Sequence, residues 1–277
     1  GHSTVRRALI GEAFRDLTDA ELRVFSAVLE GGLREGALGF SSGLGYVHAH
    51  ETPYAELRRL VPIVARAGGI YATHLRNERE GLVAAIHETV RIAEETGVRT
   101  IISHLRPLKG FEHEFESALR MIEETNADLH FDTYPFDSSI VPLYVLLPSW
   151  AQSGGLEVMA DFLSEPTIEE RVTKSFPQFG PEDIVVAYAP GAEYLVGKTI
   201  GAFAKNRDLD LNQALLELMR FTKLRAVIHY RNINLDWVIE SLRSRRAFVA
   251  SNSASFPETV HMLRHPRMSS TFPHFLD

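Results

Sequence analysis

The sequence predicts an α/β protein in which a TIM-like (β/α) barrel is interrupted by a small α+β domain. From residue 17 to residue 142, apolar runs typical of strands alternate with helical patterns in units of roughly 30 residues, as in parallel βαβ proteins. The expected strands show little polar–apolar alternation, so we expect them to be buried on both faces. An open doubly wound sheet fits the same rhythm. However, the sequence has no Gly-rich dinucleotide motif and no P-loop, which favours the barrel.

Helix start and stop signals are clear in the first part of the chain. Thr18 and Glu21 form a capping box, and the helix that they begin ends at Gly36. Thr52 and Pro53 are expected to cap and open the next helix. The remaining helices of this part are predicted at residues 82–95 and 111–125, and the strands at residues 4–10, 37–42, 69–74, 98–104 and 127–135.

The strand–helix rhythm stops after Pro142. Proline, glycine and short helices replace it, and only weak strands are predicted until a last buried strand at residues 247–252. We therefore divide the chain into barrel strands and helices at residues 1–142, an inserted small domain at residues 143–246, and the last barrel strand with its following loop at residues 247–277.

The composition is that of an ordinary globular protein. The 277 residues are 45% hydrophobic and 23% charged, and the formal net charge of −7 is spread along the chain. We therefore expect neither nucleic acid nor an anionic membrane as a partner. No apolar run approaches the roughly 20 residues of a membrane-spanning helix and no signal peptide is visible, so we expect a cytoplasmic protein. Cysteine is absent, which excludes disulfides, thiolate nucleophiles and cysteine metal ligands.

Two histidines stand at equivalent places in the predicted fold. His74 ends one predicted strand and His104 ends the next one. In a barrel these strand ends face the active site, where two imidazoles from adjacent strands are a natural pair of zinc ligands. Structural histidines at strand ends are the alternative. The charged residues just behind, Arg76 and Glu78, would then fix the loop around the ligands or form an ordinary salt bridge.

A serine hydrolase is a second alternative. The stretch GFSSG matches the G-x-S-x-G nucleophile elbow, with Ser41 as nucleophile. The elbow requires a helix directly behind the serine, but the next predicted helix cap is Thr52. A Gly/Ser-rich turn that lines a pocket explains the motif better.

Several longer motifs follow one another along nearly the whole chain. They are GHSTVR, GALGFSSGLGY, GGIYATHLRNE, TIISHLR, FDTYPF, LLPSWAQSGG, LVGKTI and HPRMSSTFPHFL. In sequence and in order they resemble the D-aminoacylase (N-acyl-D-amino-acid deacylase) family of the amidohydrolase superfamily. The resemblance implies a metal-dependent hydrolase barrel with an inserted small domain. It also implies hydrolysis of a small molecule, an N-acyl-D-amino acid, to a carboxylate and a D-amino acid.

The resemblance also implies roles for particular residues. In the family a divalent metal, usually zinc, is held by histidines that end two successive strands, and these match His74 and His104 here. Tyr46 matches a tyrosine, and Arg267 an arginine, that bind the substrate carboxylate. Arg106 is also expected to bind the substrate; it stands where the family usually has a lysine, so the charge is kept while its geometry differs.

The sequence departs from the family at the centre of the chemistry. Asn252 stands where the family has the catalytic aspartate, and an amide cannot accept the proton of the attacking water. The family's His-x-His pair and its cysteine ligand have no counterparts, so we expect zinc or another divalent metal to bind weakly. About six strands, including residues 4–10, are predicted of the eight that a barrel needs. The C-terminal segment of the family is missing as well.

Three interpretations follow from these departures. The chain is a fragment or truncated product of a deacylase, one half of a split enzyme, or a deacylase-derived protein that binds a ligand without turning it over. In the first two, a partner chain or a second copy would complete the barrel. Asn252 and the absence of cysteine favour the binding protein. The retained His74, His104, Tyr46 and Arg267 favour a hydrolase, which is the function that we expect from the family.

Overall fold

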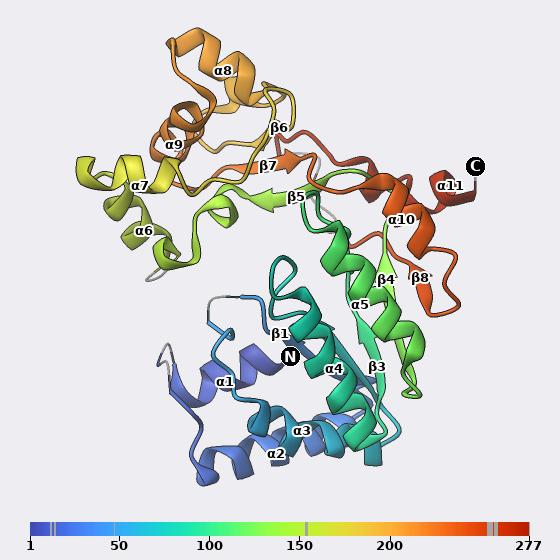
Figure 1. Cartoon of the computed structure of the whole chain (residues 1–277). Helices are drawn as coiled ribbons and strands as arrows, with labels where there is room; N and C mark the ends of the chain where they lie inside the picture. Colours follow the sequence, from blue (N-terminus) through green and yellow to red (C-terminus); the bar gives the residue numbers. More distant parts are fainter. Residues whose placement is uncertain are drawn as a thin grey trace. The chain divides into compact units, whose positions relative to one another are not determined.

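The computed structural model describes residues 1–277, apart from residues 12, 14, 47, 153–154, 254–256, 258–259 and 277 and the side chain of residue 149. The chain forms two compact units (Figure 1). The first unit contains residues 1–135, 234–252 and 271–277, and the second contains residues 136–233 and 253–270.

The first unit is an α/β unit with a parallel sheet. Its strands are β1 (Gly39–Gly43), β2 (Ile70–His74), β3 (Arg99–Ile102), β4 (Leu129–Thr133) and β8 (Ala247–Val249). Its helices are α1 (His2–Ile10), α2 (Asp19–Arg34), α3 (Tyr54–Arg66), α4 (Leu82–Thr96), α5 (Glu112–Glu124), α10 (Leu235–Ser241) and α11 (Thr271–Leu276). The strand order is β1-β2-β3-β4-β8, and every neighbouring pair is parallel, as the alternation of strands and helices predicted. The described residues form this open five-stranded sheet and no closed barrel.

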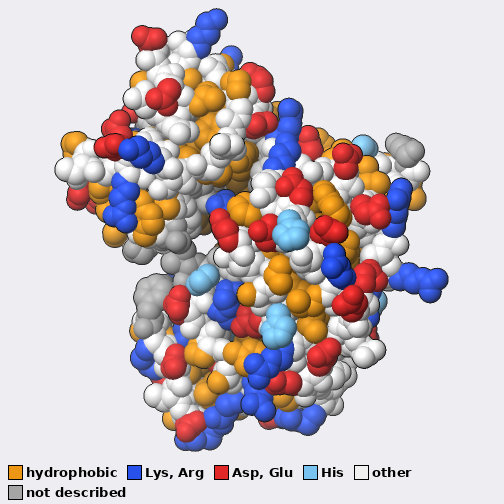
Figure 2. All heavy atoms as spheres, in the orientation of Figure 1, with side chains coloured by type: hydrophobic (Ala, Val, Ile, Leu, Met, Phe, Trp, Pro, Cys, Tyr) orange, Lys and Arg blue, Asp and Glu red, His pale blue; other side chains and the backbone are white. Residues whose placement is uncertain are grey.

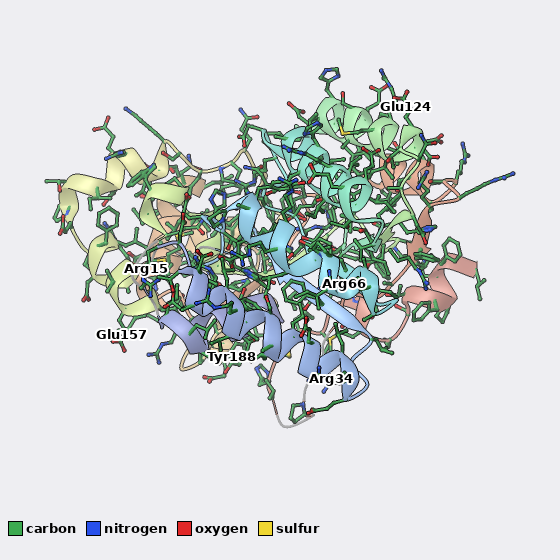
Figure 3. All side chains as sticks on the ribbon, turned by 90° about the horizontal axis from the view of Figure 1, so that it is seen from below. Arg15, Arg34, Arg66, Glu124, Glu157 and Tyr188 are labelled. Carbon is green, nitrogen blue, oxygen red and sulfur yellow. The ribbon has the colours of Figure 1, made fainter. Side chains whose placement is uncertain are left out.

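Helices α2 to α5 cover one face of the parallel sheet. Phe40 of β1 packs with Leu60 of α3, and Ile102 of β3 packs with Ile86 of α4. Neighbouring helices contact one another, and Figure 3 labels Arg34, Arg66 and Glu124, which end α2, α3 and α5. The opposite face is only partly covered, and its side chains are half-buried or exposed: Ser41, Ala72, Ile101, His130 and Phe248. The prediction that the strands are buried on both faces is therefore wrong for this chain, because the helices of the first unit pack on one face.

The first predicted strand is also wrong, since residues 4–10 belong to helix α1. Val5, Leu9 and Ile10 pack against the core cluster that includes Phe40 of β1, and Val5 and Leu9, four residues apart, share one face of the helix. In so short a segment this spacing is hard to distinguish from that of a strand.

Two helix starts show where local signals succeed and fail. The predicted capping box at α2 is confirmed, because the Thr18 side chain accepts from the Glu21 N–H and the Glu21 carboxylate accepts from the Thr18 N–H. Helix α3 instead has Pro53 as its N-cap residue, with no side-chain cap. The predicted cap Thr52 lies one residue earlier, where its carbonyl oxygen accepts a hydrogen bond from Arg76.

The second unit is a small α+β unit. Its antiparallel sheet has the order β5-β7-β6. Its elements are β5 (Ser139–Pro142), α6 (Gly155–Leu163), α7 (Glu169–Thr173), β6 (Ile184–Tyr188), α8 (Ile200–Arg207), α9 (Leu211–Phe221) and β7 (Val227–Tyr230), with short 3-10 helices at Leu143–Leu146, Ser149–Ala151, Pro166–Ile168, Glu193–Leu195 and Pro266–Met268. The predicted inserted domain ran from residue 143 to residue 246. The compact unit begins at residue 136, leaves α10 to the first unit, and takes in residues 253–270.

In the part of the chain that the structure describes, no helix combines the length and apolar character needed to cross a bilayer. On the face shown in Figure 2, acidic and basic side chains are interspersed over both units.

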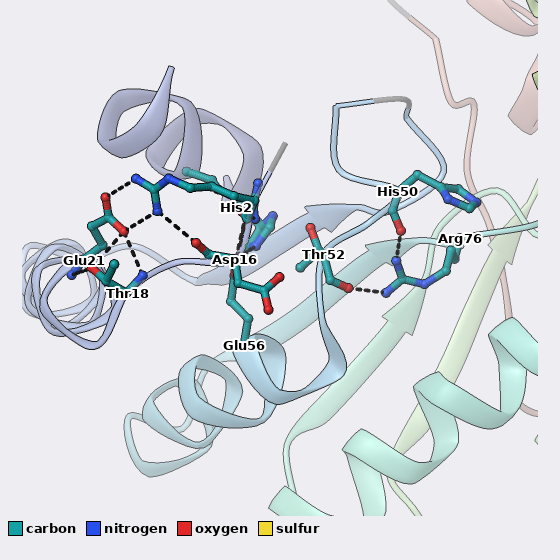
Figure 4. A network of polar contacts seen from close by, with 10 residues as sticks. His2, Asp16, Thr18, Glu21, His50, Thr52, Glu56 and Arg76 are labelled. Atoms are coloured by element: carbon teal, nitrogen blue, oxygen red, sulfur yellow. Dashed lines mark hydrogen bonds and ion pairs between the residues drawn. The ribbon is translucent and has the colours of Figure 1, made fainter. Parts of the chain in front are cut away.

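Buried polar contacts link His2 and Arg6 of α1 to Glu56 of α3. His2 Nε2 lies 2.6 Å from Glu56 Oε1, and Arg6 Nε donates to the same oxygen at 3.2 Å. The His2 ring is fully buried and packs 5.6 Å from the Phe25 ring. Figure 4 shows His2 and Glu56 in this contact. The Glu56 carboxylate therefore serves two buried donors at once.

We predict that Glu56→Ala lowers the free energy of unfolding by about 3–5 kcal/mol, because it leaves the buried Arg6 charge without its partner. Urea denaturation followed by circular dichroism measures this change. Glu116→Ala is the matched control, since the Glu116–Arg120 pair on α5 is exposed, and it should change stability little. Equal effects of the two substitutions would contradict a structural role for the buried group.

Candidate metal centre

His74 and His104 meet at the C-terminal edge of the parallel sheet. His74 is the last residue of β2, and its side chain lies on the face that the helices leave partly open. His104 follows β3 by two residues. Both imidazoles are half-buried. Because β2 and β3 are parallel and paired from Ile70 to Thr73, their carboxyl ends lie side by side.

The two rings are in direct contact. His74 Nδ1 lies 2.8 Å from His104 Nε2, and the ring centroids are 4.6 Å apart. For two ligands of one ion we expect about 3–4 Å between the nitrogens, given zinc–nitrogen distances of about 2.0–2.1 Å. The observed distance is slightly shorter and is that of a hydrogen bond between the rings. The rings therefore point at one another, as two ligands of one ion would.

Glu78 joins His74 and His104 in a group of three side chains that could bind one metal ion. One donor atom from each of His74, Glu78 and His104 lies within 4.8 Å of the others. Glu78 Oε1 lies 3.5 Å from His104 Nδ1, which is buried and makes no hydrogen bond among the described residues. The second Glu78 oxygen accepts a short hydrogen bond from Arg106. A carboxylate and two imidazoles thus converge on one place.

The pKa values of His74 and Glu78 favour the protonation states that bind a metal ion. Burial lowers the pKa of His74 to about 4, with the charges of His104 and Arg106 adding to the effect and that of Glu78 opposing it. Burial alone would raise the pKa of Glu78, but Arg106 and the two histidines outweigh it and hold the pKa well below its ordinary value. A neutral imidazole and an ionised carboxylate are the forms that bind metals.

Asp132 fixes the backbone that carries His104. Its Oδ1 accepts the His104 N–H at 2.8 Å, and its carbonyl oxygen accepts the Leu105 N–H at 2.8 Å. His104 has a φ of 44°, in the left-handed region that costs a non-glycine residue energy and is common at functional sites. Burial raises the pKa of Asp132, while the hydrogen bond from His104 opposes the rise. The contact from β4 holds the chain in the turn that aims the His104 ring at His74.

The donor set fits a divalent transition metal. Imidazole nitrogens and carboxylate oxygens are ordinary ligands of zinc and of related ions. His104 Nε2 faces His74 and could bind the ion with it, whereas His104 Nδ1, which is buried and makes no hydrogen bond among the described residues, faces Glu78. The residues present therefore fit the metal that the sequence predicted.

Tyr46 lies against the histidine pair. Its ring stacks on His74, with centroids 4.8 Å apart and planes 14° apart, and it remains 52% exposed. Gly45 allows this approach, because a Cβ there would lie 2.5 Å from His74 Nε2. The tyrosine that the sequence singled out is thus at the candidate site.

Arg106 and Arg267 have different surroundings. Arg106 is nearly buried and pairs with Glu78, and this pairing raises the pKa of Arg106 against the effect of burial. Arg267 belongs to the second unit, where its side chain is 7% exposed and its N–H donates to His265 Nδ1 at 3.1 Å.

Asn252 and Ser41 do not belong to the group of metal-binding side chains. Asn252 follows β8, is exposed, and has a φ of 44°. Ser41 lies in the middle of β1, and the next helix begins only at Tyr54, so the GFSSG motif forms a strand and no nucleophile elbow. The geometry gives no support to a serine nucleophile.

Two residues of the site were not singled out for it by sequence reasoning. Glu78 was expected to fix a loop together with Arg76, but the structure pairs it with Arg106 and places it beside His104. Asp132 lies in a predicted strand, and a carboxylate within a strand expected to be buried is the signal that could have found it. No periodic pattern identifies Glu78, because it lies in a loop.

Three characterised proteins of Alcaligenes xylosoxydans xylosoxydans are similar to parts of this chain. A D-aminoacylase is 36% identical over 140 residues, which are 49% of this chain and 29% of the relative. An N-acyl-D-aspartate deacylase is 40% identical over 105 residues, covering 38% of this chain and 21% of the relative. An N-acyl-D-glutamate deacylase is 30% identical over 155 residues, covering 54% of this chain and 31% of the relative. No family model matches the chain.

Solved structures show a similar fold. A D-aminoacylase crystal structure, reported to define a novel subset of amidohydrolases, superposes with a TM-score of 0.72 at 24% identity, covering 100% of this chain and 51% of that one. An N-acyl-D-glutamate deacylase from Bordetella bronchiseptica, solved with zinc and a phosphonate inhibitor, gives a TM-score of 0.66 at 22% identity, covering 91% of this chain and 47% of that one.

The chain thus spans about half the length of these solved structures, and the matched segments are less than a third of each characterised relative. The relatives and the fold agree with the motifs along the chain. The predicted resemblance to the D-aminoacylases and N-acyl-D-amino-acid deacylases is confirmed.

Proposed function

We propose that this chain carries the metal-binding part of an amide hydrolase that acts on N-acyl-D-amino acids and releases a carboxylate and a D-amino acid. The convergence of His74, Glu78 and His104 at the C-terminal edge of a parallel sheet carries this proposal. The reaction and substrate class come from the similarity to characterised deacylases. Zinc is the metal that we propose first, because two imidazoles and a carboxylate are a common zinc donor set.

Each residue of the candidate site has its own role in this proposal. His74, Glu78 and His104 would hold the metal, which when bound polarises the amide carbonyl and lowers the pKa of a water molecule. Asp132 orients His104 through its backbone N–H. Tyr46 packs on the open side of His74 and supplies a phenol next to the site.

The substrate carboxylate needs cationic or hydroxyl partners. We propose Tyr46 and Arg267 for this task, as the family resemblance implies. Arg106 was expected to share it, but it is paired with Glu78. We therefore assign Arg106 first to balancing the Glu78 charge, so that it would reach a substrate only in exchange for that partner.

Asn252 supports a second candidate function. The leaving amine must gain a proton as the tetrahedral intermediate collapses, and an amide side chain has no acidic proton to give. A chain with Asn252 would bind an N-acyl-D-amino acid and turn it over slowly or not at all. The second candidate is therefore a ligand-binding protein derived from a deacylase.

We also propose that the parallel sheet forms part of a TIM-like barrel. In the described residues β1 and β8 each have one neighbouring strand, and the five strands run parallel with helices on one face. Closing such a sheet requires further strands between β8 and β1. They would come from another part of a longer polypeptide, from a partner chain or from a second copy.

For the metal centre, we predict that His74→Ala or His104→Ala weakens zinc binding by about 100-fold or more, since each removes one of three ligands. Glu78→Gln should weaken it by about tenfold, because the amide keeps one oxygen but loses the charge. Isothermal titration of metal-free protein with zinc measures both effects. His87→Ala is the control, because His87 is exposed on α4 and outside the group. Unchanged zinc affinity in the histidine variants would end the metal proposal.

For catalysis, we predict that Asn252→Asp raises kcat for N-acetyl-D-amino acids by about 100-fold or more and leaves KM nearly unchanged, because proton transfer acts in the transition state. The measurement is steady-state hydrolysis of a panel that includes N-acetyl-D-aspartate and N-acetyl-D-glutamate, with zinc added.

Asn126→Asp adds the same charge at an exposed turn and should have no effect. Rapid wild-type hydrolysis that Asn252→Asp does not improve would show that another group moves the proton. Binding of the panel without turnover by either protein would favour the second candidate function.

A further inference from the structure

Tyr46 lies in the loop between β1 and α3, of which residues 44–46 and 48–53 are described, and it reaches the candidate site. Short backbone turns link this loop: the Ala49 N–H donates to the Tyr46 carbonyl at 2.8 Å, and the Thr52 N–H donates to the Ala49 carbonyl at 3.0 Å. Ala49, which belongs to this loop, is buried. A displacement of the loop near Thr52 would therefore be transmitted through these turns to Tyr46.

Arg76 binds this loop from the end of β2. Its Nη1 donates a short hydrogen bond to the His50 carbonyl oxygen, and its Nη2 donates to the Thr52 carbonyl oxygen at 3.0 Å. Figure 4 shows the Arg76 guanidinium between these two carbonyls. Arg76 stands two residues after His74 in the sequence. The same short segment thus carries a proposed ligand and holds the loop that packs on that ligand.

Helix α4 fixes the other side of the guanidinium. Arg76 Nε donates to Glu88 Oε2 at 3.0 Å, and Nη2 donates to Glu88 Oε1 at 2.8 Å. Both side chains are about four-fifths buried, at 21% and 19% exposure. Arginine suits this place because its planar fork serves two carbonyls and a carboxylate at once, whereas a lysine has a single nitrogen to share among them.

From these contacts we infer that Arg76 is a positioning residue, which sets the Tyr46 ring against His74 at the candidate metal centre. Its hydrogen bonds go to Glu88 and to the backbone of His50 and Thr52, so it acts through the loop that carries Tyr46. Its effect on substrate binding rests on the proposed function, whereas its effect on Tyr46 does not.

The first test follows the Tyr46 ring itself, without metal or substrate. Protein labelled with 3-fluorotyrosine gives 19F resonances for its 8 tyrosines, and the one that Tyr46→Phe removes is that of Tyr46. Arg76→Lys and Glu88→Gln should shift or broaden this resonance. Arg120→Lys is the control, because Arg120 lies on α5 and forms an exposed pair with Glu116. An unmoved Tyr46 resonance in folded Arg76→Lys protein would overturn the inference.

Glu88→Gln keeps the arginine and its two carbonyl contacts, so it provides a milder variant if Arg76→Lys folds poorly. Circular dichroism establishes which variants are folded. If the Tyr46 resonance moves in Glu88→Gln but not in Arg120→Lys, the link from α4 to Tyr46 through Arg76 is supported.

The second test separates positioning from simple structural support. Binding of N-acetyl-D-glutamate to zinc-loaded protein, measured by calorimetry, should weaken about tenfold in Arg76→Lys, while zinc affinity changes less than about twofold. Tyr46→Ala should weaken binding too, and the double variant should be no worse than Tyr46→Ala alone, because residues that act through one another are not additive.

Additive losses in this cycle would show that Arg76 acts on ligand binding by another route and would overturn the inference. If the wild type does not bind N-acetyl-D-glutamate, the proposed function fails for that substrate, and the fluorine test still decides whether Arg76 positions Tyr46.

Discussion

The parallel register of β2, β3 and β4 is the constraint on which the candidate site depends. Thr73 lies opposite Ile102, and Ile102 lies opposite Phe131, so the strands end at one level. His74 and Asp132, one residue beyond this row, therefore lie at the same edge of the sheet. A register slip of one residue would move a side chain to the opposite face of the sheet. The burial of Phe131 and Ile102 against α4 and α5 prevents such a slip.

The charge balance of the site follows from Glu78 and Arg106. Arg106 keeps the Glu78 carboxylate ionised in a buried place, so the carboxylate can bind a cation without first losing a proton. The positive charge of Arg106 also offsets the negative charge of Glu78. A dication would therefore gain its affinity mainly from direct ligand bonds rather than from long-range attraction. Its binding would also compete with Arg106 for the carboxylate.

Local signals in the sequence predicted much of the first unit. The capping box of Thr18 and Glu21, and the glycine that ends α4 at position 97, act within a few residues, so the pattern alone identifies them. Features that depend on distant partners could not be identified in this way. Glu78 and Arg106 meet from two separate loops, and the open sheet face depends on which elements of the whole unit cover it. The sequence of the short α1 segment fits both the helical and the strand period, and only its packing on the core shows that it is a helix.

Holding a metal and turning over an amide place different demands on this chain. His74 and His104 come from the ends of neighbouring strands of one sheet, and Glu78 comes from the loop that follows β2, so the three candidate ligands lie close together. In the functions that we propose, proton transfer depends instead on position 252, after β8, where the backbone has a φ of 44°. Asn and Asp are among the residues that tolerate this left-handed conformation best, so the backbone accepts either side chain. On this proposal the hydrolase and the binding protein differ by one atom at position 252, an amide nitrogen or a carboxylate oxygen, because the backbone there accepts both residues.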